Sequence, residues 1–170
     1  MEIRTRRRLA WAGALLIAVS LLLSAAAVCA DSFSSTDAGI RYRGTYRIGS
    51  TSTGWKKSLG KYTRRKYDGC TAGTNSYMYT FKSRGVKVET LQSKKGGAEQ
   101  IITIILSKKT VPTIAGLRVG DKVSKMVSLY GTGYKKSGTT YKYTRGAYRM
   151  TVNTSAKTQK ITKITLLKDI

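Results

Sequence analysis

The segment that decides the fold reads Gly116-Leu117-Arg118-Val119-Gly120-Asp121-Lys122-Val123-Ser124-Lys125-Met126-Val127-Ser128-Leu129-Tyr130-Gly131. Four of its apolar residues recur with the period of one face of an α-helix: Val123, Met126, Val127 and Tyr130. Lysine and serine side chains fall on the opposite face. We therefore expect a single helix that Asp121 caps at its start and that Gly131 ends in a left-handed conformation.

A weaker copy of this segment occurs earlier in the chain, which predicts two tandem repeats. At one constant offset, four residues of the first copy match four of the second: Gly49, Trp55, Leu59 and Gly60 match Gly120, Met126, Tyr130 and Gly131. The matching helix, about Ser50 to Leu59, contains Gly54, which costs roughly 1 kcal/mol relative to alanine inside a helix. The first helix is therefore expected to be the weaker one.

Alternating apolar and polar residues follow each expected helix, as is typical of half-buried β-strands. Hairpin turns are expected at Arg84-Gly85 and at Arg145-Gly146. The expected strands lie around Tyr77 to Phe81 and Tyr141 to Tyr143, and over Val86–Leu91, Ile101–Leu106, Tyr148–Val152 and Ile161–Leu166. Ile101–Leu106 is apolar at both odd and even positions, which predicts burial on both faces or a place at the junction between the repeats. Segments 61–73 and 93–97 are expected to be mobile basic loops.

The first thirty residues have the pattern of a secretory signal peptide. Basic residues precede an apolar run, and Val28-Cys29-Ala30 offers small residues at a cleavage site. An uncleaved membrane anchor and lipidation at Cys29 are the alternatives. The expected organisation is a signal peptide over 1–30, a flexible linker over 31–39, a first repeat over 40–107 and a second repeat over 108–170. The protein is therefore expected to be secreted or associated with the cell envelope.

Cysteine usage fits an exported protein that packing alone holds together. After cleavage at Ala30, Cys70 is the one remaining cysteine, so an internal disulfide is excluded. Cys70 is interpreted either as a small buried apolar side chain or as a reactive or dimerising thiol.

Net charge is the strongest compositional signal. The chain has 32 basic and 8 acidic residues and a formal charge of +24; without Glu2 and the four leader arginines the charge is +21. The chain contains no histidine, so the charge hardly changes between pH 5 and 8. Such a protein is expected to bind anionic partners: an anionic cell-wall polymer such as teichoic acid, a membrane surface, or nucleic acid without specificity. Another exported protein is a further possible partner.

The sequence predicts neither catalysis nor a cofactor nor a metal site. Histidine, the usual proton carrier and metal ligand, is absent, and the acidic residues are scattered. Glu89 and Glu99 could face one another across a hairpin, but we interpret them as charge partners of nearby lysines. No zinc spacing, phosphate-binding loop or nucleophile elbow occurs.

Basic residues near the first helix and in the expected loops are the candidate anion-binding site: Lys56, Lys57, Lys61, Arg64, Arg65, Lys66, Lys94 and Lys95. Tyr62, Tyr67, Tyr77 and Tyr79 lie close to them in sequence, and mixtures of basic and aromatic residues suit stacking on sugars or bases. For the strand aromatics Tyr77 and Tyr79, packing beneath the helix is the preferred interpretation.

The second half resembles a family of secreted and lipoprotein domains common in Gram-positive bacteria. The residues that carry the resemblance are Val111-Pro112-Thr113-Ile114-Ala115-Gly116-Leu117, Gly120-Asp121 and Tyr130-Gly131, which match a V-x-T-x-x-G-I-x-x-G…Y-G signature. These domains are similar in turn to the β-lactamase inhibitory protein and to small outer-membrane assembly lipoproteins. The resemblance implies an α+β fold of two tandem repeats, each a short helix on an antiparallel sheet of three or four strands. It also implies a possible use of the concave sheet face to inhibit or assemble with another protein.

Overall fold

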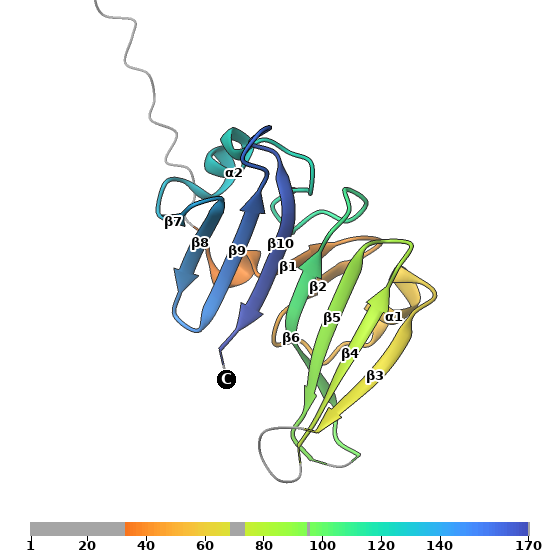
Figure 1. Cartoon of the computed structure of the whole chain (residues 1–170). Helices are drawn as coiled ribbons and strands as arrows, with labels where there is room; N and C mark the ends of the chain where they lie inside the picture. Colours follow the sequence, from red (N-terminus) through yellow and green to blue (C-terminus); the bar gives the residue numbers. More distant parts are fainter. Residues whose placement is uncertain (1–32, 69–73, 95, 170) are drawn as a thin grey trace, which may run out of the picture.

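The computed structural model describes residues 33–68, 74–94 and 96–169 and is an α+β protein (Figure 1). Within these residues it contains two short α-helices, a main antiparallel sheet of eight strands and a small sheet of two strands. The elements are a 3₁₀ turn Ser35–Asp37, β1 Gly39–Arg41, β2 Thr45–Arg47, α1 Gly54–Leu59, β3 Thr63–Asp68, β4 Asn75–Phe81, β5 Val86–Gln92, β6 Glu99–Leu106, α2 Val123–Tyr130, β7 Lys135–Ser137, β8 Thr140–Arg145, β9 Tyr148–Thr154 and β10 Ile161–Lys168. The expected signal peptide, Cys29, Cys70 and Lys95 lie outside the described residues. None of the described helices has the length and hydropathy needed to cross a membrane.

The main sheet has the strand order β3-β4-β5-β6-β10-β9-β8-β7, with antiparallel pairing throughout. The two predicted hairpin turns are confirmed, because Gly85 and Gly146 lie between paired strands with φ of 64° and 55°. Strand β6 pairs with β10 at the middle of the sheet, with Leu106 opposite Ile164. Ile101–Leu106, which forms most of β6, therefore lies at the centre of one continuous sheet.

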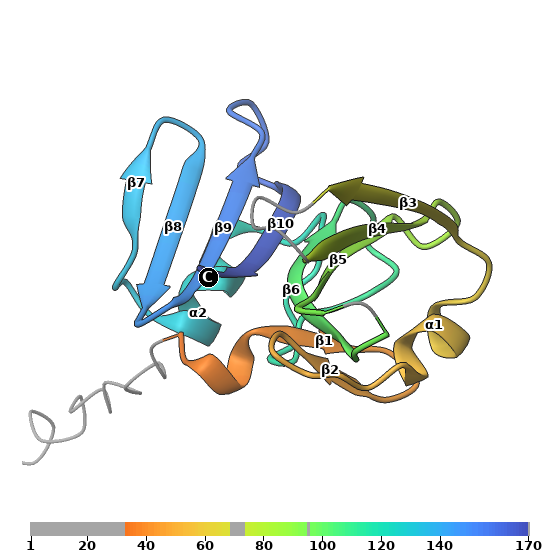
Figure 2. The same cartoon turned by 90° about the horizontal axis from the view of Figure 1, so that it is seen from below.

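Both helices and the β1–β2 hairpin lie on one side of the main sheet, which leaves the other side uncovered by any described element (Figure 2). Side chains of the covered side alternate along the strands and form one core. Trp55 of α1 packs edge-on against Tyr79, with ring centroids 5.0 Å apart. In the second half, Tyr130 of α2 packs against Tyr143, with centroids 5.9 Å apart. These strand tyrosines are buried, which confirms that they pack beneath the helices.

The amphipathic pattern of the opening segment is confirmed, but its helix is shorter than predicted. Met126 and Tyr130 are buried, and Gly131 ends α2 with φ of 69°. The helix begins at Val123 because residues 120 and 121 are hydrogen-bonded to β10: Gly120 N donates to Ile161 O at 2.7 Å, and Ile161 N donates to Asp121 O at 2.8 Å.

Asp121 does not cap α2, contrary to the prediction. The N-cap position is occupied by Lys122, which makes no side-chain cap. The Asp121 carboxylate instead accepts a hydrogen bond from Arg118 N at 2.8 Å and lies 2.9 Å from Lys125 Nζ. Asp121 therefore stabilises the turn before the helix. Likewise, Gly54 is the first residue of α1 rather than an interior one, so its cost to the helix is smaller than expected.

Two segments predicted to be flexible have regular structure. The linker prediction for 31–39 is wrong from Phe33 onward, because the Phe33 ring is buried 6.0 Å from Tyr130 and Ala38 is fully buried. The predicted loop after α1 contains strand β3, which pairs with β4 along its whole length. Its charged residues are compatible with a strand because β3 is at the edge of the sheet, where charges are well tolerated.

Candidate binding site

The Glu99 carboxylate lies on the covered side of the sheet and is in contact with two cations and two hydroxyl groups. Its Oε2 accepts hydrogen bonds from Tyr79 Oη at 2.7 Å and from Thr90 Oγ1 at 2.9 Å. Lys56 Nζ lies 3.4 Å from Oε2, and Arg64 Nη2 lies 3.2 Å from Oε1. Lys56 and Arg64, two of the predicted anion-binding residues, therefore share one carboxylate, and 23% and 45% of their side chains remain exposed.

The groups around Glu99 are satisfied by one another. Burial raises the pKa of Glu99, but the hydrogen bonds from Tyr79 and Thr90 and the charges of Lys56 and Arg64 outweigh this effect and hold the pKa below its usual value. Burial and then the hydrogen bond to Glu99 raise the pKa of Tyr79 well above its usual range. Lys56 Nζ also lies 4.5 Å from the Tyr79 ring centroid. The cluster therefore joins α1 to four strands, β3, β4, β5 and β6.

The predicted run Arg64-Arg65-Lys66 is divided between the two faces of the sheet. Successive side chains of a strand point to opposite faces. Arg64 is paired with buried Tyr79 and reaches the covered side, whereas Arg65 is paired with Met78 on the uncovered side. The sequence interpretation treated the run as one loop cluster. Because the segment is a strand, its cations have different surroundings and different roles.

Glu89 and Glu99 do not face one another. Glu89 lies between the buried residues Val88 and Thr90 and is paired with Thr103, so it points to the uncovered face. Glu99 is paired with Gln92 near the end of the hairpin and points to the covered side. Among the described residues, no group of three or more cysteine or acidic side chains could hold a metal ion.

We define the open face as two rows of residues that run across the uncovered side of the main sheet. The first row is Arg65, Met78, Glu89, Thr103, Leu167, Arg149 and Thr144. The second row is Thr63, Thr80, Lys87, Ile105, Thr165, Thr151, Lys142 and Lys135. Neighbouring members of a row are about 4.8 Å apart, the spacing of adjacent strands. The rows therefore form a continuous surface across the sheet.

Cations dominate the open face. Arg149 is paired with Asp169, whose Oδ2 lies 2.7 Å from its guanidinium. Four further cations of the open face are exposed and form no ion pair with any described residue: Arg65, Lys87, Lys135 and Lys142. Glu89 is the single acid in the two rows. Most other described acids have partners away from this face, so these four cations keep their charge; other exposed lysines, Lys57, Lys94 and Lys157 among them, lie elsewhere on the molecule.

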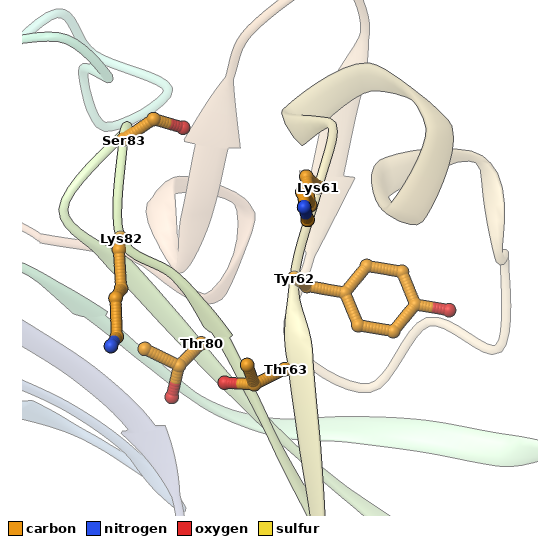
Figure 3. Close-up of a pocket in the computed structure, with 6 residues that line it drawn as sticks. All are labelled: Lys61, Tyr62, Thr63, Thr80, Lys82 and Ser83. Atoms are coloured by element: carbon orange, nitrogen blue, oxygen red, sulfur yellow. The ribbon is translucent and has the colours of Figure 1, made fainter.

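A pocket of about 280 Å³ lies at the end of the β3–β4 hairpin, beside the second row of the open face. It is lined by Lys61, Tyr62, Thr63, Thr80, Lys82 and Ser83. Figure 3 shows the side chains of Thr63, Thr80 and Lys82 close together, whereas the Tyr62 ring points away from Lys82. Tyr62 packs on the core instead, with its ring 5.2 Å from Tyr79. The polar part of the lining therefore consists of ammonium and hydroxyl groups.

The structure places the remaining predicted site residues apart from one another. Lys57 is exposed on α1, Lys61 lines the pocket, and Lys94 is exposed beyond β5. Sequence reasoning missed Lys87, Lys135 and Lys142 as members of one face. The alternation Val86-Lys87-Val88 could have indicated Lys87, since a lysine between two buried valines of a strand must point to the other face.

Comparisons with known proteins identify no family for this chain. No family model matches the sequence, and no curated protein is similar to it. Among solved structures, the fold is distantly similar to that of a cysteine-rich secretory protein from Staphylococcus aureus subsp. aureus Mu50, with 13% sequence identity and a TM-score of 0.46. The match covers 71% of this chain and 44% of that protein, so this chain spans less than half of its length.

Proposed function

We propose that this chain is a non-catalytic protein of the cell envelope that binds an anionic polymer across the open face of its main sheet. The observation that carries the proposal is the unpaired positive charge of that face, where Arg65, Lys87, Lys135 and Lys142 are exposed. We place the binding site on the sheet and not in the basic loops, because Lys56 and Arg64 already contact Glu99, whereas the four unpaired cations of the open face have no carboxylate partner among the described residues.

Two local features of the open face favour an anionic ligand. Lys135 and Lys142 are directly opposite one another on neighbouring strands, an arrangement that costs stability unless an anion lies between them. The Arg65 guanidinium lies 5.0 Å from the Tyr67 ring centroid, and 40% of Tyr67 is exposed. A cation stacked on an exposed aromatic ring can contact a sugar or polyol and its phosphate together. Both features suit a polymer that alternates such groups.

Individual exposed charges contribute little, so binding requires several contacts at once. An exposed ion pair is worth about 0.2–1 kcal/mol. A polymer that engages four cations gains the sum of these small terms, and salt weakens each of them. Affinity that falls steeply with salt concentration is therefore the expected signature.

Removing charge from the open face tests the proposal. The triple variant Lys87→Gln, Lys135→Gln, Lys142→Gln is expected to bind teichoic acid about tenfold more weakly at low salt. The matched control Lys57→Gln, Lys94→Gln, Lys157→Gln removes the same charge from exposed positions elsewhere and is expected to change binding less than twofold. Equal losses in both variants would show that only net charge matters and would refute a site on the open face.

A second candidate function is recognition of another exported protein by the same face. It is favoured by half-buried apolar side chains in the middle of the two rows: Met78, Ile105 and Leu167. An apolar centre with a charged rim is common in protein interfaces. This function predicts a stoichiometric partner that remains bound at high salt, whereas polymer binding does not.

In this proposal the protein is exported, because its leader has the pattern of a signal peptide. Its partner is then a cell-wall polymer or a membrane surface, which the chain reaches after its leader is cleaved, kept as an anchor, or lipidated at Cys29.

We also infer that the two halves arose by duplication. In each half a helix precedes four antiparallel strands. Gly49 N donates to Ile101 O at 2.7 Å, as Gly120 N does to Ile161 O. The corresponding glycine in each half therefore hydrogen-bonds the segment before the helix to the last strand of that half.

A further inference from the structure

The pocket at the end of the β3–β4 hairpin combines positive charge with hydroxyl donors. Lys61 and Lys82 are exposed, and neither forms an ion pair with a described residue. Thr63 and Thr80 are directly opposite one another on β3 and β4, and Ser83 lies in the turn that follows β4. The pocket has no acidic side chain in its lining. An anion is therefore the ligand that the lining favours.

A third ammonium group lies next to the pocket. Lys108 Nζ donates a hydrogen bond to the backbone carbonyl oxygen of Lys82 at 3.0 Å. This contact holds a positive charge beside the turn that carries Lys82 and Ser83. Lys108 therefore adds positive charge beside the backbone of a residue that lines the pocket.

The types of donor in the pocket suit a phosphate group. Lysine acts as a point charge and is a common phosphate binder, because it imposes no planar geometry on its partner. Hydroxyl groups can donate to the separate oxygens of a tetrahedral phosphate. The volume of about 280 Å³ also leaves space for a polyol or sugar unit next to a phosphate. The aliphatic stems of the lysines and the threonine methyl groups can pack against such a unit.

We propose that this pocket binds a phosphate group together with its neighbouring polyol unit, as found in phosphodiester polymers and in phospholipid headgroups. The inference rests on the proposed function and specifies its ligand. The second row of the open face begins with Thr63 and Thr80 and continues to Lys87. A polymer held by one phosphate in the pocket can therefore continue along the row of cations.

Titration with glycerol phosphate, followed by NMR on the isotopically labelled full-length chain, tests the pocket directly. Saturable shifts are expected for the amides of Thr63, Thr80 and Ser83, with smaller and non-saturating shifts for glycerol or acetate. The variants Thr80→Val and Lys82→Gln are expected to weaken glycerol phosphate binding about threefold to fivefold. Lys57→Gln is the matched control and should leave it unchanged. Thr80→Val preserves the β-branched shape, and Lys82→Gln changes an exposed residue, so at least one variant is expected to fold normally.

Competition identifies the source of the phosphate. Free glycerol phosphate is expected to displace either teichoic acid or phosphatidylglycerol vesicles from the chain, and the one displaced is the natural source. Phosphate binding in the pocket would be refuted by the absence of saturable shifts, by equal shifts with acetate, or by displacement of neither ligand. The function proposed for the open face would survive that result if the Lys87, Lys135 and Lys142 triple variant still lost polymer binding.

Discussion

Replacing Glu99 by glutamine tests whether the cluster around it is a stabilising part of the fold. The substitution keeps the shape of the side chain and removes its charge. Lys56 and Arg64 then lose their ion-pair partner, and Tyr79 and Thr90 donate to a neutral oxygen or lose an acceptor. The protein is therefore expected to become less stable at neutral pH.

The size of the effect can be estimated from the contacts. A hydrogen bond to a charged group contributes about 1.5–3 kcal/mol, against about 1 kcal/mol for a neutral one. Two such bonds are weakened but not lost, whereas the two ion pairs are partly exposed and contribute less than 1 kcal/mol each. The exposed fraction of the Glu99 side chain is 14%, so solvent replaces few of these contacts. Glu99→Gln is expected to lower the free energy of unfolding by about 2 kcal/mol.

The dependence on pH separates this explanation from a general packing defect. The pKa of Glu99 is lowered in the folded state, so its contribution is fully present above the unfolded pKa of about 4.3 and is lost as the pH falls through the folded value. Urea unfolding at several pH values is the assay. The difference between the wild-type protein and Glu99→Gln should be about 2 kcal/mol at pH 7 and should shrink steadily toward pH 3.

Glu89→Gln is the control, because it removes the same charge from the open face, where Glu89 has no ion pair with a described residue. Its effect should stay below about 0.5 kcal/mol. A Glu99→Gln defect of the same size at every pH, or a Glu89→Gln defect of equal size, would refute the reasoning.

Phe33→Ala is expected to lower the free energy of unfolding by about 3–4 kcal/mol in urea denaturation, because the ring is buried against Tyr130 and Tyr143; a change below 1 kcal/mol would restore the interpretation of this segment as a linker. Alkaline conditions are expected to destabilise the protein, because burial raises the pKa of Tyr130 to about 12 and also raises the pKa of Tyr143. Groups with raised pKa stabilise the fold fully below the unfolded value near 10 and lose that contribution above it, so melting temperatures should fall above pH 10. A constant melting temperature between pH 9 and 12 would contradict this expectation.

Much of the fold could be predicted because its periodic signals are local. The stripe Met126 and Tyr130 identified α2, and the alternation around Tyr79 identified β4. The features of the fold that the sequence did not predict depend on residues far away in the chain. The start of α2 is set by Ile161, which hydrogen-bonds to Gly120 and Asp121 from the last strand. A residue forty positions away cannot be inferred from helical periodicity.

The candidate site was harder to predict because charge in the sequence does not show which cations already contact a carboxylate. Strand β3 illustrates the difficulty: adjacent Arg64 and Arg65 look equivalent in sequence. In the fold, Arg64 pairs with Glu99, thirty-five residues away, while Arg65 faces solvent beside Tyr67. Only the register of β3 on β4 shows that the two arginines point to opposite faces of the sheet. The seven described members of the eight predicted residues therefore lie on different parts of the structure, and their binding of an anion stays a prediction.

The dependence of binding on salt differs according to whether all cations of the molecule or only those of the open face contact the polymer. If total charge governed attraction to polymers, every exposed lysine would contribute, and the formal charge of +24 would set the salt dependence. If the open face binds the polymer, only cations that contact phosphates release counterions, with a slope of roughly 0.7–0.9 per contact in log affinity against log salt. The four unpaired cations then contribute about 3 to the slope, the pocket residues Lys61 and Lys82 add at most about 2, and Lys87→Gln alone should reduce the slope by nearly one. A slope that is larger, and that responds equally to Lys57→Gln, would assign the interaction to the charge of the whole molecule and not to the sheet.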